Sequence, residues 1–207
     1  MDHRRIRRGQ TLKDIQNNWE DPSSLTLLTN DLGSVQQYVG VLVRQTPHDV
    51  HRLVELPSSD IDISLWIYTH LRRILQDFNV PWLTRLQEVC TSSGGCNAMR
   101  IGDDILLCRE HNDGRPCTAQ EYIFHAMDAA ADTLGSIGAF HSKLTSIPRH
   151  CTRLFPGVCK QIARVFSHLY LHHNEMFASC EADTSLYARF KCLVEANSLL
   201  PEDALPI

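Results

Sequence analysis

Two cysteines and a distant histidine-rich segment constrain the fold of this chain most strongly. Five residues separate Cys90 from Cys96, and the segment SHLYLHH at 167–173 holds three histidines. Thiolate and imidazole groups are the ligands that tetrahedral zinc takes in proteins, and a site closed by four of them has no open position for catalysis. The sequence therefore predicts a structural metal site that joins two separated segments.

The choice of histidines stays open on geometric grounds. His168 and His172 are one helical turn apart and share a helix edge. His168 and His173 are about 140° apart on an ideal helix, yet zinc sites use His pairs with three to five intervening residues. Either His172 or His173 can therefore complete the set.

Size and cysteine usage favour a cytosolic protein with a single folded domain. With 207 residues, of which 43% are apolar, the chain suits one folded domain over 29–207, preceded by a polar tail over 1–28 that Trp19 could anchor. No apolar run approaches the roughly 20 residues of a membrane helix, and no hydrophobic segment follows the start MDHRRIRRGQ. Eight cysteines without a signal peptide or a CxxC pair indicate reduced thiols, one metal site and a cytosolic protein.

Two alternative classes of zinc protein fit the sequence less well. A zinc hydrolase needs an open coordination position and a general base, and no HExxH motif is present. A nucleic-acid-binding zinc finger keeps its Cys and His pairs about 12 residues apart, and such domains are usually basic, whereas this chain has a net charge of −4. Neither an enzyme nor a nucleic-acid binder is expected.

Hydrophobic periodicity predicts a mainly helical fold. The expected helices cover 31–43, 47–56, 65–75, 81–90, 118–135, a long segment from 156, and a last one from 183 or 184 to 200. Thr118 and Glu121 form a capping box at the start of one of them. The segment NAMRIGDDILLC, with Gly102 at its turn, is the convincing β signal and predicts a hairpin.

Charge is distributed unevenly along the chain. No Asp or Glu occurs from 133 to 174, a stretch that contains five Lys and Arg residues. On the long helix, Lys160 and Arg164 lie one turn apart, opposite an apolar stripe of Val158, Ile162, Val165, Phe166 and Leu169. The simplest interpretation is a solvated face, but together with Arg153 these cations could hold a phosphoryl group.

Five ordered motifs resemble one known family. They are VQQYV, LWIYTHLRR, ILLCREH, GVCKQIARVFSHLYLHH and PEDALPI, and the resemblance as a whole extends from about Trp19 to Ile207. They resemble the MOB (MOB kinase activator-like) family, and specifically its phocein branch. The resemblance implies an all-α helical bundle with a small β-hairpin and a structural zinc ion held by Cys90, Cys96, His168 and His173.

The cysteine spacing departs from the family pattern. Family members have four residues between the two cysteines, whereas this chain has five, TSSGG. Gly94 and Gly95 could let the longer loop close without strain. Cys108 or Cys117 is a physically possible substitute for Cys96, although both are read more simply as small buried apolar residues.

The resemblance also implies a function without catalysis. Phocein-like proteins belong to assemblies of a striatin-type scaffold, protein phosphatase 2A-type subunits and a germinal-centre (STE20-type) kinase, associated with the Golgi and vesicle traffic. Lys160 and Arg164 match two positions with which some family members bind phosphopeptides, with Arg153 nearby, while a third basic position is Gln161 here. The alternative within the family is a direct coactivator of NDR/LATS-class kinases.

Overall fold

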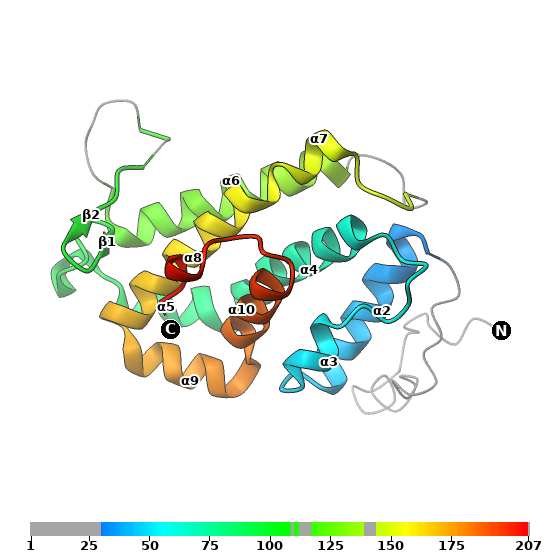
Figure 1. Cartoon of the computed structure of the whole chain (residues 1–207). Coiled ribbons are helices and arrows are strands. Elements are labelled where there is room, and N and C mark those ends of the chain that lie inside the picture. Colours follow the sequence, from blue (N-terminus) through cyan, green and yellow to red (C-terminus); the bar gives the residue numbers. More distant parts are fainter. Residues whose placement is uncertain (1–29, 109, 112–116, 139–143, 207) are drawn as a thin grey trace, which may run out of the picture.

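The protein is a bundle of helices with one short hairpin (Figure 1). The computed structural model describes residues 30–108, 110–111, 117–138 and 144–206. The helices are α2 (Leu32–Gln45), α3 (Val50–Val54), α4 (Ile63–Phe78), α5 (Thr84–Val89), α6 (Ala119–Gly138), α7 (Arg149–Thr152), α8 (Phe155–His172), α9 (Asn174–Thr184) and α10 (Leu186–Ala196). The expected tail over 1–28 lies outside the described residues. The predicted helical fold with a small hairpin is confirmed.

Helix starts follow the capping residues in the sequence. The carboxylates of Asp31, Asp49 and Asp62 accept hydrogen bonds from backbone amides at the starts of α2, α3 and α4, which satisfies amides that have no partner within the helix. The capping box is confirmed, because the Thr118 hydroxyl accepts from the Glu121 amide at 3.2 Å and the Glu121 carboxylate accepts from the Thr118 amide at 3.0 Å.

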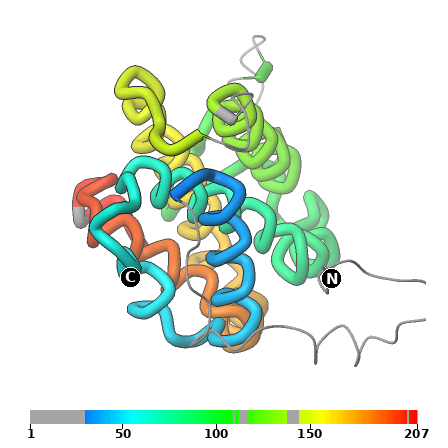
Figure 2. The backbone as a smooth tube through the Cα atoms, turned by 90° about the vertical axis from the view of Figure 1, so that its right-hand side faces the viewer, coloured from blue at the N-terminus to red at the C-terminus, as the bar shows by residue number. Residues whose placement is uncertain are grey.

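Helix α4 lies at the centre of the bundle and packs against α2, α6 and α10. Figure 2 shows the same arrangement from the side, with α6 and α7 at the top of the molecule. Its apolar residues Trp66, Ile67, Ile74 and Phe78 are all buried. Within the described parts of the chain, no helix combines the length and apolar character that a bilayer-spanning segment requires.

An aromatic cluster joins α4, α8, α9 and α10. Phe166 on α8 is its hub, with ring centroids 5.2 Å from Phe78, 5.3 Å from Trp82 and 5.1 Å from Tyr187. The apolar stripe predicted for the long helix, to which Phe166 belongs, is buried throughout. This packing fixes the rotation of α8, so that His168 and Lys160 project from defined faces.

The hairpin is short, and its strand residues do not form a hydrophobic core. Its strands, β1 (Arg100–Ile101) and β2 (Asp104–Ile105), are antiparallel, with Arg100 opposite Ile105. Gly102 in the turn has φ 59°, a left-handed conformation that glycine adopts at little cost. The turn predicted at Gly102 is therefore present, and β1 packs against α8.

Candidate metal centres and an adjoining cavity

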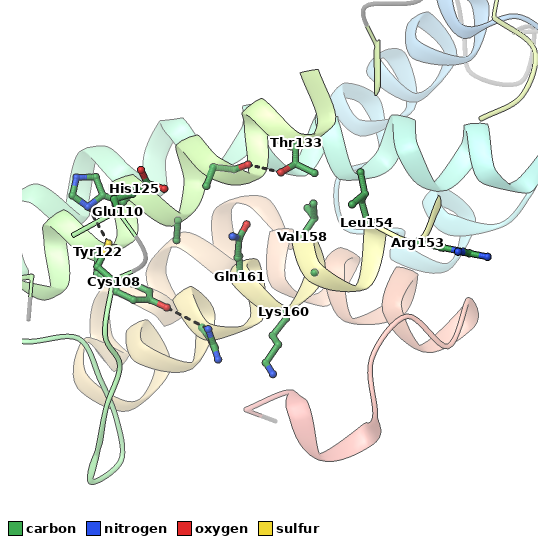
Figure 3. A pocket seen from close by; sticks show the side chains of 14 residues that line it. Cys108, Glu110, Tyr122, His125, Thr133, Arg153, Leu154, Val158, Lys160 and Gln161 are labelled. Carbon is green, nitrogen blue, oxygen red and sulfur yellow. Dashed lines mark hydrogen bonds between the residues drawn. The ribbon is translucent and has the colours of Figure 1, made fainter. Parts of the chain in front are cut away.

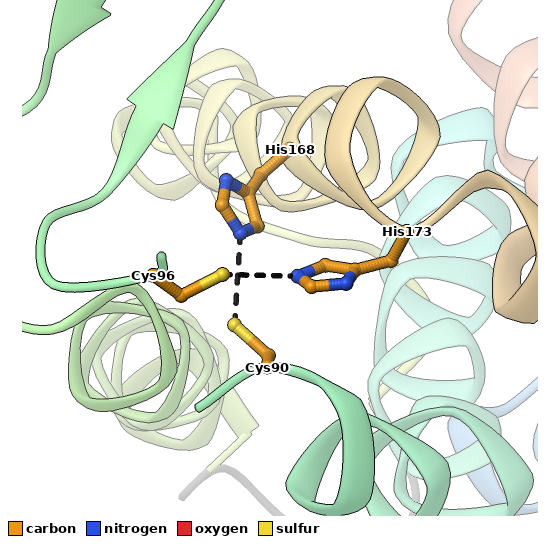
Figure 4. Close-up of side chains that lie close together, drawn as sticks. All are labelled: Cys90, Cys96, His168 and His173. Carbon is orange, nitrogen blue, oxygen red and sulfur yellow. Dashed lines mark hydrogen bonds between the residues drawn. The ribbon is translucent and has the colours of Figure 1, made fainter. Parts of the chain in front are cut away.

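The four side chains predicted as metal ligands converge on one point (Figure 4). The Cys90 sulfur lies 3.6 Å from Nε2 of His168, and the Cys96 sulfur lies 3.3 Å from Nε2 of His173. Bond lengths of zinc to sulfur and nitrogen place such atoms roughly 3.6 Å apart around a tetrahedral ion. All four ligand atoms lie within 4.8 Å of one another, so this cluster could hold a metal ion.

The longer cysteine loop closes through a single turn of 3-10 helix, Ser92–Gly94. The Thr91 carbonyl accepts hydrogen bonds from the amides of Gly94 and Cys96, at 3.0 and 3.2 Å. Gly95 ends the turn with φ 96°, which L side chains adopt only with strain. The fifth residue between the cysteines is thus accommodated in the backbone, and Cys96, rather than Cys108 or Cys117, faces Cys90.

The two histidines reach the cluster because α8 ends between them. His168 lies within the helix, whereas His173 has φ −135° and ψ 43°, outside helical values. This change of backbone direction turns His173 toward the cysteines, while His172 is exposed on the last helical turn. The amino-acid pattern predicts a single long helix from residue 156, whereas the structure has two helices, α8 and α9.

Hydrogen bonding and burial prepare His168 to bind a metal. Its Nδ1–H donates to the Arg100 carbonyl at 2.9 Å, which leaves the lone pair on Nε2 directed at Cys90. Burial lowers the pKa of His168 to about 4, and burial also lowers the pKa of His173, so both rings are neutral at pH 7. Burial raises the pKa of the Cys90 thiol, and a bound cation would favour the thiolate instead.

A second cluster of the same composition lies at the start of α6. It consists of Cys108, His111, Cys117 and His125, whose ligand atoms also lie within 4.8 Å of one another. Nδ1 of His125 is 3.4 Å from the Cys108 sulfur and 3.7 Å from the Cys117 sulfur, and Nδ1 of His111 is 2.8 Å from the Cys117 sulfur. This cluster could hold a metal ion as well.

This second cluster was not predicted from the sequence. Cys108 and Cys117 were expected to be small buried apolar residues, and both thiols are indeed buried, but each faces a histidine. The usable signal was the motif CREH, in which Cys108 and His111 have the close spacing of a metal-binding pair. The other pair, Cys117 and His125, is split between a loop and a helix, so only the fold brings it together.

A cavity of about 440 Å³ lies beside the packed helices α6 and α8 and is lined by the predicted cations (Figure 3). Arg153, Lys160 and Arg164 line it together with Gln161, and among the described lining residues Glu110 is the one carboxylate. Three cations against one carboxylate make the cavity attractive to an anion.

The two predicted helix cations differ in their surroundings. Lys160 is exposed, as expected. Arg164 is half-buried, and its Nη1 donates to the Tyr122 hydroxyl on α6 at 3.5 Å. Arg164 therefore faces solvent only in part, because this contact holds its guanidinium at the cavity wall.

Fold and site together define a helical bundle with two Cys2His2 clusters and a cationic cavity. A family model described as the Mob1/phocein family matches residues 43–205, and the chain belongs to this family. It is 34% identical over 203 residues to MOB kinase activator-like 4 of Drosophila melanogaster, covering 98% of this chain and 88% of that protein.

Two further relatives agree with this assignment. MOB-like protein phocein of Caenorhabditis elegans is 30% identical over 207 residues, covering 99% of this chain and 90% of that protein. MOB kinase activator-like 3 of Drosophila melanogaster is 24% identical over 154 residues, covering 71% of this chain and 68% of that protein. The family predicted from the sequence motifs is confirmed.

Proposed function

We propose that this protein is a non-catalytic, zinc-stabilised adaptor that links a striatin-type scaffold, protein phosphatase 2A-type subunits and a germinal-centre (STE20-type) kinase, with a role in signalling and vesicle traffic. The observation that carries the proposal is the cationic cavity on α8 of a phocein-like chain. Such an adaptor raises the effective concentration of its partners for one another. It would act in the cytoplasm and reach Golgi or vesicle membranes through these partners.

The first cluster supports a structural metal in this proposal. Cys90, Cys96, His168 and His173 supply two thiolates and two imidazoles, a donor set that favours zinc over magnesium or calcium. Among the described residues the cluster contains no carboxylate, so four protein ligands close the site. Zinc bound there would stabilise the fold and leave no position for a reacting water.

The cavity supports phosphopeptide binding. Arg164 is oriented by Tyr122, and Lys160 lies one turn earlier on the same helix, so both could donate charge-assisted hydrogen bonds to one phosphate. Arg153 lies at the far end of the cavity, and its side chain extends outward from it (Figure 3), so it could contact peptide residues beyond the phosphate. Gln161 contributes an amide in place of a third helix cation, which lowers the charge of the site.

Affinity purification followed by mass spectrometry tests the adaptor function. The wild-type chain is compared with the double variant K160E/R164E and with R52E, a control that reverses an exposed charge on α3 outside the cavity. We expect the wild type and R52E to recover scaffold, phosphatase and kinase, and the double variant to lose the partner that is bound through phosphate. Recovery of NDR/LATS-class kinases without scaffold or phosphatase would favour the alternative function.

The same three proteins are then titrated against a phosphothreonine peptide library and its unphosphorylated form. Reversal of two charges that donate to phosphate should weaken phosphopeptide binding at least about tenfold, because each charge-assisted hydrogen bond contributes about 1.5–3 kcal/mol. The R52E control should bind as the wild type does. Equal binding by all three proteins would place the phosphate site elsewhere.

A further inference from the structure

The second cluster shares part of its structure with the cationic cavity. Cys108 and His125 belong to both, whereas His111 and Cys117 belong to the cluster and do not line the cavity. Cys108 and His125 lie at the end of the cavity where Tyr122 is found (Figure 3). Tyr122 accepts the hydrogen bond from Arg164, so this end of the wall positions the half-buried cation.

The donor atoms of the second cluster suit a tetrahedral ion. Two of the three sulfur-to-nitrogen distances, 3.4 and 3.7 Å, are close to the roughly 3.6 Å spacing around zinc. Both histidines face the thiols with Nδ1, so each Nε2 is left to carry the proton.

The chain enters and leaves this cluster at the start of α6. Cys108 follows β2, while Cys117 precedes the Thr118 cap of the helix. The backbone amide of Ala119 donates to the carbonyl of Cys96 at 3.0 Å, which connects this region to the first cluster. A metal here would tie the segment after the hairpin to the first two turns of α6.

We propose that Cys108, His111, Cys117 and His125 bind one zinc-like divalent cation, and that this metal holds the α6 wall of the cavity in place so that anion affinity depends on its occupancy. The part that concerns affinity rests on the proposed phosphate-binding function. A divalent cation bound by two thiolates has a net charge of zero, and two protonated thiols without a metal also have a net charge of zero. The coupling is therefore positional: the metal fixes Tyr122 and, through it, Arg164.

The first measurement is the metal content of the purified wild-type chain, by inductively coupled plasma mass spectrometry and by cobalt substitution. We expect two metal ions per chain, both in tetrahedral coordination when replaced by cobalt. The double variant H111A/C117S, which leaves every cavity-lining side chain in place, should contain one. A C192S control, which removes a half-buried thiol outside both clusters, should contain two. One metal per wild-type chain that is retained in H111A/C117S, or that is lost from His168→Ala, would overturn the proposal.

The second measurement is the affinity of these three proteins for the phosphothreonine peptide library. Coupling between sites in proteins commonly spans about 5-fold to 150-fold in affinity, and we expect a loss in this range for H111A/C117S but not for C192S. Hydrogen exchange at the amides of residues 119–129 should be faster in H111A/C117S, because these turns lose their anchor.

The outcomes separate this inference from the function on which it rests. If the wild type has two metals but does not bind the phosphopeptides, the phosphate-binding function fails, and hydrogen exchange alone decides the positional role. Faster exchange in H111A/C117S would then support that role. Unchanged exchange, or unchanged peptide affinity in a variant that has lost one metal, would overturn it.

Discussion

His70 is the most unusual single residue in the core. It is completely buried in α4, its ring centroid lies 4.6 Å from that of Trp66, and neither ring nitrogen has a hydrogen-bond partner among the described residues. Burial, with a smaller contribution from Arg189, lowers the pKa of His70 to about 3. The ring is therefore neutral in the folded protein at every physiological pH.

This burial predicts a specific loss of stability in acid. In the unfolded chain a histidine binds a proton below about pH 6.5, whereas folded His70 stays neutral down to a pH of about 3. Acid therefore favours the unfolded state, and His70 should cost about 1.4 kcal/mol of stability for each pH unit within this window.

Urea unfolding at several pH values measures this effect. The variant His70→Leu should lose stability less steeply between pH 6 and pH 4 than the wild type. His150→Leu, at an exposed histidine on α7, serves as the control and should keep the wild-type slope. Equal slopes for His70→Leu and the wild type would show that His70 does not titrate in this way.

Residue types alone predicted the first cluster but not the choice of histidine. Two cysteines and three histidines were visible in the sequence, and the family resemblance selected His173. The structure shows the physical reason, since His173 leaves the helix and turns toward Cys96 while His172 stays exposed. The second cluster could not be derived in this way, because His125 meets its thiols only once α6 has packed.

At the scale of elements, helix starts were predictable and one helix end was not. Aspartate caps and the Thr118 capping box are local signals, because the capping side chain and the amides it satisfies lie within a few residues. The end of α8 at His172 has no such signal, since residues 173–184 contain neither glycine nor proline.

The loop between the cysteines gives a prediction at this scale. Gly95→Ala should destabilise the protein by about 1–2 kcal/mol, because alanine at φ 96° is strained although no atom lies within 4 Å of the added methyl group. Gly135→Ala, in the exposed interior of α6, should instead stabilise by up to about 1 kcal/mol. Chemical denaturation measures both, and an unaffected Gly95→Ala variant would contradict the role given to this turn.

At the scale of the whole molecule, helix α8 connects stability with binding. Its buried face carries Phe166, its last turns carry His168, and its other side presents Lys160 and Arg164 to the cavity. The hydrophobic periodicity of the sequence predicted the buried face and the cationic face, because successive residues of an α-helix are rotated by about 100° around its axis. The cavity itself was not predictable, since its other wall comes from α6, far away in the sequence.

The central claim is that a metal at Cys90, Cys96, His168 and His173 stabilises this fold. Two neighbouring substitutions on α8 test it: His168→Ala removes a cluster residue, and His172→Ala removes an exposed histidine outside the cluster. Zinc content and the free energy of unfolding are measured for both variants and the wild type.

We predict that His168→Ala loses one zinc ion per chain and several kcal/mol of stability, because the binding free energy of a structural metal contributes to folding. His172→Ala should keep its zinc and a stability close to that of the wild type. If both variants retain the same zinc content, or if stripping zinc from the wild type with a chelator leaves its unfolding free energy unchanged, the metal does not stabilise the fold.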